Sequence, residues 1–250
     1  MSEFWMIALV FVLSYLAGAI PFGLLVVWVF SGKDIRSIES GRTGGTNAMR
    51  AAGFIAGLLT AALDVLKGVS TAWITAWLAP GLPWVQVVAA LMAILGHNYS
   101  IFLIEEKIGG GIRLRGGAGG APALGGAIAL WPPSAVIILP LGALTYILIG
   151  FASVTTMSVA FFAGIIFFVR AVQGIGPWEY VLYGVAALLI VMWALRPNLA
   201  RLAAGTERVV GLRALWKKRK EKEQEHQKQE QEQANASVSR SSQRRQENGI

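Results

Sequence analysis

Long apolar stretches alternate with short polar or glycine-rich segments along most of the chain. A helix needs about 20 apolar residues to cross a hydrocarbon core about 30 Å thick, and several stretches reach or approach that length. The pattern predicts an all-α polytopic membrane protein with about seven transmembrane helices, of which the fourth and sixth are short. We expect these helices at residues 4–30, 54–79, 84–104, 119–131, 134–150, 158–172 and 180–195.

The first apolar segment, residues 4–30, is predicted to stay in the mature protein. It is longer than the apolar region of a secretory signal. It follows Glu3 rather than Lys or Arg, and no small-residue cleavage site comes after it. We therefore interpret it as a retained membrane span.

Composition supports a membrane protein and excludes several other classes. Hydrophobic residues make up 55% of the chain and charged residues 14%, well below the roughly 25% of soluble domains. Too little polar surface remains to cover a water-facing domain, and the apolar content excludes a disordered chain. The chain has no Cys, which excludes a disulfide scaffold and a cysteine-based metal or redox site.

The distribution of basic residues predicts the orientation. They gather at 31–53, at 105–118 and in the C-terminal tail, whereas the proline-containing turns on the opposite side carry no Lys or Arg. The positive-inside rule then puts the N-terminus outside and the C-terminus in the cytoplasm, which requires an odd number of spans. The basic residues of the first two segments are Lys33, Arg36, Arg42, Arg50, Lys107, Arg113 and Arg115.

Two regions follow from the charge pattern: a seven-span membrane domain at 1–207 and a basic cytoplasmic tail at 208–250. Of the net charge of +8, the first region carries +3 and the tail +5. A basic tail on an apolar body favours contact with an anionic membrane face over nucleic acid. Residues 208–222 are predicted to form an interfacial helix. The remainder is predicted to be either disordered or a solvated helix.

The first candidate site is the polar segment 40–50, just after the first span. Glycines allow a close approach of the backbone, while hydroxyl, amide and guanidinium groups add hydrogen-bond donors. This chemistry predicts a phosphate cradle at the start of a helix. The alternative is a polar loop with a capped helix, with Thr46 or Asn47 as the cap. The candidate anion-binding residues are Ser40, Gly41, Gly44, Thr46, Asn47 and Arg50.

Asp64 and Lys67 form a second candidate within an apolar span. At a spacing of three residues they share one helix face and can form an ion pair. Ionisable groups inside a membrane are costly and usually face a polar interior. The pair is either part of a functional polar site or a structural ion pair that joins two helices. These two interpretations are compatible.

His97 and the glycine run after Arg115 form a third candidate. His97 is either a proton carrier, a hydrogen-bond donor to phosphate, or a histidine satisfied within the core. The run that contains Gly116, Gly117 and Gly119 is either a second phosphate cradle or a stretch of close helix packing.

Two further groups lie at the cytoplasmic ends of later spans. One is the pair of hydroxyls at Ser153 and Thr155, and the other is the polar block that begins with Arg196 and Asn198. They either bind an anion or serve only as helix caps and snorkelling side chains. Because all the candidates can reach the cytoplasmic face, the sequence favours a site for a phosphorylated substrate that enters from the cytoplasm. The carboxylates of the body are scattered, and we predict no metal site.

These residues, taken in order, resemble the PlsY-type acyl-phosphate:glycerol-3-phosphate acyltransferases. The similarity covers residues 18–207. The motifs that carry it are Ser-Gly-x-x-Gly-x-Thr-Asn-x-x-Arg from Ser40, Leu-Asp-x-x-Lys-Gly from Leu63, Gly-His-x-x-x-x-Phe from Gly96, the glycine run from Gly116, Ser153, Asn198 and Gly205-Thr206-Glu207.

The resemblance implies a bacterial plasma-membrane enzyme that faces the cytoplasm. Such an enzyme moves a fatty acyl group from acyl phosphate to the 1-hydroxyl of glycerol 3-phosphate, giving lysophosphatidic acid in the first step of phospholipid synthesis. It implies no cofactor, metal or acyl-CoA, and no nucleic acid partner. The sequence leaves the oligomeric state open, with a monomer as one possibility. The tail is expected to contact either anionic lipid or a soluble enzyme that produces acyl phosphate.

The resemblance also assigns roles to residues. The implied catalytic residues are Arg50, Lys67, His97 and Arg115. The implied substrate-binding residues are Ser40, Gly41, Gly44, Thr46, Asn47, Gly116, Gly117, Gly119, Ser153, Thr155 and Asn198.

The chain departs from the family pattern at four positions. Ala118 stands where a Lys is expected, Pro122 where a Thr is expected, Arg42 in place of an Asn, and Leu195 in place of a His. Arg42 or Arg113 is a candidate source of the missing cation. The departures leave two other functions open: a transporter of a small phosphorylated anion, and a non-catalytic lipid-binding relative.

Overall fold

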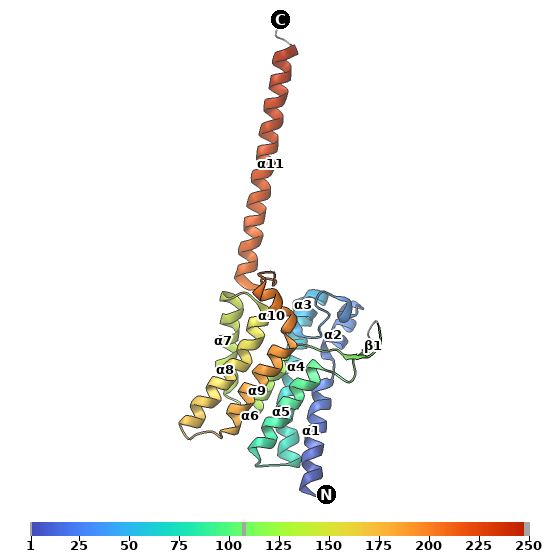
Figure 1. Cartoon of the computed structure of the whole chain (residues 1–250), viewed down its shortest axis with the longest axis vertical. Coiled ribbons are helices and arrows are strands. Elements are labelled where there is room, and N and C mark those ends of the chain that lie inside the picture. The colour runs from blue at the N-terminus through green and yellow to red at the C-terminus, as the bar shows by residue number, and fades with distance from the viewer. Residues whose placement is uncertain (1, 107–108, 248–250) are drawn as a thin grey trace.

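The computed structural model describes residues 2–106 and 109–247, and it shows a helical bundle with one long helix projecting from it (Figure 1). A hairpin of two short antiparallel strands, in which Glu105 lies opposite Arg113, corrects the prediction of a purely helical chain. The helices are α1 (Glu3–Ala19), α2 (Phe22–Ser31), α3 (Gly45–Ala52), α4 (Phe54–Leu78), α5 (Pro83–Asn98), α6 (Gly120–Leu130), α7 (Ser134–Leu148), α8 (Ala152–Val172), α9 (Glu179–Ala194), α10 (Arg196–Ala203) and α11 (Gly211–Glu247), with a short 3-10 turn at Ile35–Ser37 and strands β1 (Ile104–Glu106) and β2 (Ile112–Leu114).

The first predicted span is interrupted between α1 and α2. Pro21 cannot donate a backbone hydrogen bond, and its ring prevents an unbroken helix. The break leaves carbonyls that need other donors: Lys67 Nζ donates to Ile20 O at 3.0 Å, and Ser100 Oγ donates to Ala19 O at 2.5 Å. The interruption is thereby joined to α4 and to the loop after α5.

Two predicted helix ends were wrong by several residues. Helix α5 ends at Asn98 rather than near residue 104, because the chain turns there into the β-hairpin. Helix α8 begins at Ala152 rather than near residue 158, which places Ser153 in its first turn.

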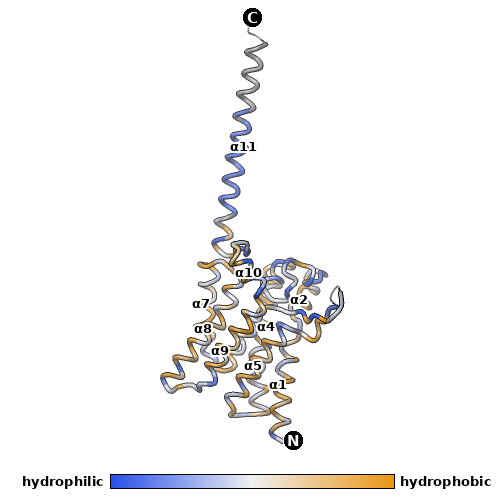
Figure 2. The backbone as a smooth tube through the Cα atoms, in the orientation of Figure 1, coloured by the Kyte–Doolittle hydropathy of each residue, from blue (hydrophilic) through white to orange (hydrophobic). Residues whose placement is uncertain are grey.

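Among the described residues, three helical segments are long and apolar enough to cross a membrane: Glu3–Ser31, Phe54–Leu78 and Ala152–Val172. Helices α9 and α10 meet at 73° and give a fourth candidate if they are counted together. Helix α6 has 11 residues, a length of about 16 Å, and is shorter than the hydrocarbon core. The body of the bundle is apolar along its length (Figure 2). Its surface exposes large apolar side chains such as Trp77 and Val136, as contact with lipid requires.

Small residues bring the helices of the bundle close together. A β-carbon on Gly125 of α6 would lie 2.1 Å from Val65 O of α4, and one on Gly96 of α5 would lie 2.2 Å from Tyr15 O of α1. Only glycine permits such an approach, which is a common way of packing helices in membranes. In the core beside them, the Tyr183 hydroxyl donates to Ala123 O at 2.6 Å.

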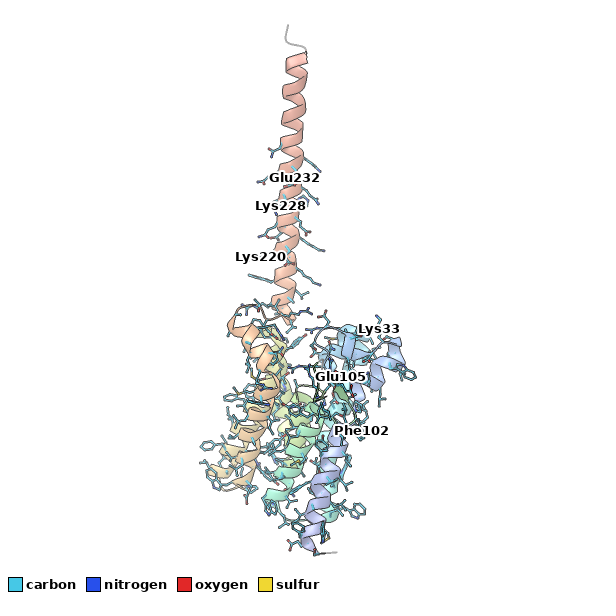
Figure 3. All side chains as sticks on the ribbon, turned by 45° about the vertical axis from the view of Figure 1, so that its right-hand side comes forward. Lys33, Phe102, Glu105, Lys220, Lys228 and Glu232 are labelled. Carbon is cyan, nitrogen blue, oxygen red and sulfur yellow. The ribbon has the colours of Figure 1, made fainter. Side chains whose placement is uncertain are left out.

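The polar loops and the tail lie at the end of the bundle opposite the N-terminus (Figure 1). Lys33 and Glu105 lie at that end, while Lys220 and Lys228 project from α11 beyond the body (Figure 3). The segment before α11 pairs with the α7–α8 connection, where Val210 N donates to Gly150 O at 2.8 Å. Lys107, which was used to predict the orientation, lies outside the described residues.

Candidate active site

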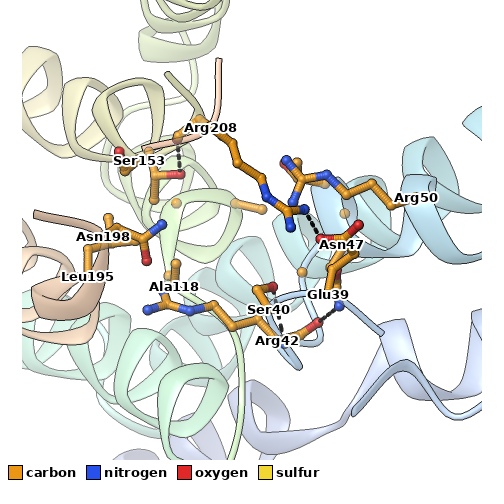
Figure 4. A pocket seen from close by; sticks show the side chains of 18 of the residues that line it. Glu39, Ser40, Arg42, Asn47, Arg50, Ala118, Ser153, Leu195, Asn198 and Arg208 are labelled. Atoms are coloured by element: carbon orange, nitrogen blue, oxygen red, sulfur yellow. Dashed lines mark hydrogen bonds and ion pairs between the residues drawn. The ribbon is translucent and has the colours of Figure 1, made fainter. Parts of the chain in front are cut away.

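A cavity of about 440 Å³ lies at this polar end of the bundle (Figure 4). It lies where α3, α6, α8 and α10 begin. Its lining comes from six separate parts of the sequence: Glu39, Ser40, Arg42, Gly44, Gly45, Thr46, Asn47 and Arg50; Ala61 and Asp64; His97; Ala118, Gly119, Gly120 and Ala121; Ala152, Ser153 and Thr156; and Leu195, Asn198, Arg201, Thr206, Glu207 and Arg208.

The starts of three helices line the cavity: residues 44–46 at the start of α3, residues 119–121 at the start of α6 and residues 152–153 of α8. The first N–H groups of a helix have no acceptor within it, and the helix dipole adds partial positive charge. Gly44 and Gly119 are the residues that precede α3 and α6, and neither helix start has a side-chain cap. The alternative in which Thr46 or Asn47 caps a helix is therefore wrong, and the three helix starts lie together on one cavity.

Asn47 holds the loop that precedes α3. Its Nδ2 lies 2.9 Å from Arg42 O, 3.0 Å from Ile38 O and 3.2 Å from Ile35 O. The residue is 3% exposed. This amide therefore sets the path of the loop that carries Ser40 and Arg42, besides lining the cavity.

Arginines supply most of the charge around the cavity. Arg50 of α3 lines the cavity and is exposed. Arg201 Nε lies 3.1 Å from Glu207 Oε2, and Arg208 forms an ion pair with Glu39 that joins the start of the tail to the first loop. The arginines of the lining outnumber its carboxylates, so the cavity as a whole favours anions.

Asp64 and His97 form one wall of the cavity. Asp64 Oδ1 lies 2.9 Å from Lys67 Nζ and 3.5 Å from His97 Nδ1, which confirms the predicted pairing of Asp64 with Lys67. Lys67 does not line the cavity, because its ammonium group points toward Asp64 and Ile20 O. This cluster holds α4 against α5 and against the break between α1 and α2.

The glycine run serves two purposes at different positions. Gly117 N donates to His97 O at 2.9 Å, and a β-carbon on Gly116 would lie 2.0 Å from the same carbonyl. These two glycines permit close packing of the chain. Gly119 lines the cavity at the start of α6 with a φ of +91°, a conformation that favours glycine. Close packing is therefore confirmed for Gly116 and Gly117, whereas a phosphate cradle at Gly119 stays a prediction.

Arg115 is directed away from the cavity. Its Nε lies 2.5 Å from Glu105 Oε2, and its Nη1 donates to Arg36 O at 3.1 Å. The side chain therefore joins the β-hairpin to the loop before α3. Gly41, with a φ of +65°, lies directly against it.

Helix α8 contributes two hydroxyl residues to the cavity lining, Ser153 and Thr156. The predicted residue Thr155 does not line the cavity. Residues three apart share a helix face, so Thr156 follows Ser153 into the cavity. The Thr155 hydroxyl instead donates to Phe151 O at 3.2 Å.

The structure brings together one part of the predicted site and leaves another outside the lining. The predicted residues that line the cavity are Ser40, Gly44, Thr46, Asn47, Arg50, His97, Gly119, Ser153 and Asn198. The predicted residues that do not are Gly41, Lys67, Arg115, Gly116, Gly117 and Thr155.

Several residues of the lining were not predicted as site residues. Arg201 and Glu207 belong to the polar block after the last span, whose clustering was the available signal. Arg208 was assigned to the tail. Glu39 had no signal of its own, because its partner is 169 positions further along the chain.

The fold and the cavity define a helical membrane protein with a cavity lined by arginines and helix starts at one end of its bundle. The chain belongs to the glycerol-3-phosphate acyltransferase family, whose model matches residues 8–205. This confirms the family resemblance found in the sequence. The tail lies beyond the matched residues.

Curated relatives cover most of this chain. It is 40% identical over 204 residues to a glycerol-3-phosphate acyltransferase of Thermus thermophilus, covering 81% of this chain and 94% of that protein. It is 41% identical over 213 residues to glycerol-3-phosphate acyltransferase 2 of Moorella thermoacetica, covering 84% of this chain and all of that protein.

Two crystal structures of the integral membrane glycerol 3-phosphate acyltransferase PlsY (YgiH) share the fold. The glycerol 3-phosphate form has a TM-score of 0.71 and 28% identity, and the lysophosphatidic acid form has a TM-score of 0.69 and 27% identity. Each comparison covers 84% of this chain and 98% of the other.

Proposed function

We propose that this protein transfers a fatty acyl group from acyl phosphate to the 1-hydroxyl of glycerol 3-phosphate. The hydroxyl oxygen attacks the acyl carbon, the bond from that carbon to the phosphate oxygen breaks, and phosphate leaves with the electron pair. The products are lysophosphatidic acid and inorganic phosphate. The observation that carries this proposal is the convergence of three uncapped helix starts and several arginines on one cavity.

The proposed chemistry needs positioning and charge stabilisation more than a nucleophilic side chain. Acyl phosphate is a mixed anhydride with a good leaving group. The N–H groups of the helix starts and the cations of the cavity can bind phosphoryl oxygens and stabilise negative charge that develops on the acyl oxygen.

We assign the hydroxyl proton to a phosphate oxygen of the substrate rather than to His97. The imidazole is enclosed by protein on both sides: Nδ1 faces Asp64 at 3.5 Å, and Nε2 lies against Gly117. In this proposal His97 orients the wall that contains Asp64 and the start of the glycine run. Arg50 and Ser153 are the proposed contacts to substrate.

For the topology we propose seven crossings with the N-terminus outside. Helices α1, α4, α5, α6, α7, α8 and α9 run alternately between the two ends of the bundle (Figure 1). The turns at 79–82, 131–133 and 173–178 carry no Lys or Arg, whereas the segments around the cavity are basic. The positive-inside rule then supports a cavity that opens to the cytoplasm of a bacterial cell.

For the tail we propose contact with anionic lipid at its base. Leu212, Leu215 and Trp216 are exposed there, next to Lys218 and Arg219. An apolar face beside basic residues is typical of an interfacial helix. Recruitment of a soluble enzyme that produces acyl phosphate remains the second hypothesis, because the rest of α11 is polar and projects from the body.

Purified protein in detergent, supplied with labelled glycerol 3-phosphate, tests the proposed reaction. We expect lysophosphatidic acid with palmitoyl phosphate and none with palmitoyl-CoA. Arg50→Ala should lower kcat/KM more than about tenfold, which corresponds to about 1.4 kcal/mol of barrier. Lys33→Ala, which removes an exposed cation outside the cavity, is the matched control and should leave kcat/KM within about twofold.

Other outcomes would overturn the proposal. Acyl transfer from palmitoyl-CoA would contradict the assigned donor. Flux of glycerol 3-phosphate into liposomes without turnover would indicate a transporter. Binding of acyl phosphate without any product would indicate a non-catalytic lipid-binding relative.

A further inference from the structure

Arg42 extends from the first loop across the cavity to the end of α9. Its Nη2 donates to Ala194 O at 2.7 Å, a contact between residues 152 positions apart. Figure 4 shows its side chain directed toward Ala118, Leu195 and Asn198, which line the same cavity. The backbone at Arg42 is held in place from the other side by the Asn47 amide.

The charge of Arg42 is buried and has no carboxylate bound to it in the part of the chain that the structure describes. Burial and the nearby charge of Arg201 lower the pKa of Arg42, while Glu207 raises it. A guanidinium keeps its proton in spite of such shifts. Glu207 is already bound on both oxygens, by Arg201 and by Asn198 at 2.8 Å. The structure therefore leaves a cation inside the cavity that lacks an anion.

One N–H group of Arg42 is also without a partner. Its Nη1 is buried and makes no hydrogen bond to any described residue. A buried charged donor left unpaired carries a large desolvation penalty. The other arginines of the lining differ: Arg201 and Arg208 are paired with carboxylates, and Arg50 is exposed.

We propose that the guanidinium group of Arg42 binds a phosphoryl group of a substrate at the wall formed by the starts of α6 and α10. The proposal rests on the proposed acyltransferase function and adds a specific cation to it. Ala118 and Leu195 leave this wall without a basic side chain of their own, so Arg42 supplies the charge there. Of the two sources considered in the sequence, Arg113 is exposed on β2 and does not line the cavity.

The test compares Arg42→Gln with Arg113→Gln as the matched control. Glutamine removes the charge and keeps a polar amide, which is shorter than the guanidinium group and does not extend as far toward Ala194 O. We expect Arg42→Gln to raise the KM of glycerol 3-phosphate, of palmitoyl phosphate, or of both by about tenfold or more, and the substrate affected identifies the phosphoryl group that Arg42 binds. Arg113→Gln should change neither KM more than twofold.

A second variant tests whether charge, rather than shape, is responsible. In Arg42→Gln/Ala118→Lys a cation returns to the cavity from another element, and we expect at least half of the lost kcat/KM, on a logarithmic scale, to be recovered. If Arg42→Gln leaves both KM values within twofold and only lowers the unfolding midpoint, Arg42 is merely a structural link to Ala194, and the proposal is wrong.

A binding measurement separates this proposal from the proposed function. Glycerol 3-phosphate and inorganic phosphate should each raise the unfolding midpoint of the unmodified protein, followed by tryptophan fluorescence. The shift should be lost in Arg42→Gln and kept in Arg113→Gln. If no lysophosphatidic acid forms but this difference remains, the reaction is wrong and the anion-binding role of Arg42 stands. If phosphate stabilises both variants equally, the role of Arg42 is wrong.

Discussion

Replacing Asn47 with alanine removes the amide that holds the loop before α3. In the folded protein this amide reaches the carbonyls of Ile35, Ile38 and Arg42, and the side chain is almost fully buried. An Nδ2 group carries two hydrogens, so it satisfies two carbonyls well at any moment and shares with the third. The loss therefore amounts to about two hydrogen bonds rather than three.

The expected cost follows from this count. A buried hydrogen bond contributes about 1 kcal/mol net, and a carbonyl left unsatisfied costs about 1–3 kcal/mol. Because the loop borders a polar cavity, water can reach part of the vacated space, which keeps the loss of unfolding free energy near the low end, at about 2 kcal/mol. Asn47→Asp should be at least as unstable, because its carboxylate would face the same carbonyl oxygens.

The assay is unfolding in mixed micelles by increasing SDS, followed by the fluorescence of the nine Trp residues. Thr46→Ala changes an exposed neighbour on the same helix and should lower the unfolding free energy by less than about 0.5 kcal/mol. We also expect Asn47→Ala to lose more than about tenfold in kcat/KM, because the loop carries Arg42. If Asn47→Ala is as stable as Thr46→Ala, the amide does not hold the loop and the reasoning fails.

Three further changes test other parts of the structure. Gly117→Ala should cost about 1–3 kcal/mol in unfolding free energy, because its β-carbon would lie 1.8 Å from His97 Nε2; an unchanged SDS midpoint would contradict this packing. Lys67→Met should cost about 3–5 kcal/mol by leaving Asp64 buried without its partner, and adding Asp64→Asn should restore part of it; a loss below about 1 kcal/mol would rule out a strong ion pair. Deleting residues 217–250 should leave the midpoint and the rate per molecule unchanged, because residues 218–233 of α11 are exposed; a slower enzyme would show that the tail contributes to turnover.

Hydropathy alone did not predict several details of the fold. Pro21 lies within an uninterrupted apolar run, so the run predicts one span although the proline divides it into α1 and α2. The start of α8 was placed too late because the hydroxyl residues from Ser153 onward lower the local hydropathy. The hydroxyls of Thr155 and Thr156 donate to Phe151 O and Ala152 O, one turn earlier in the chain.

The sequence by itself determined the class of protein, most of its helices and the end of the bundle at which the polar segments gather. Apolar length and the positions of basic residues are local properties, and membrane insertion depends on them directly. The sequence also predicted many of the residues that line the cavity, because glycine, hydroxyl and arginine residues at a helix start are typical of a phosphate site formed by one segment. These inferences need no knowledge of distant contacts.

Only the tertiary structure decided which basic side chains line the cavity. Lys67 and Arg115 turn to partners elsewhere in the fold, whereas Arg42 crosses to Ala194 and presents an unpaired N–H. A long basic side chain can reach in any of several directions from the same backbone position. Its direction depends on which carbonyls and carboxylates the packed helices place around it, and those neighbours come from parts of the chain that become adjacent only after folding.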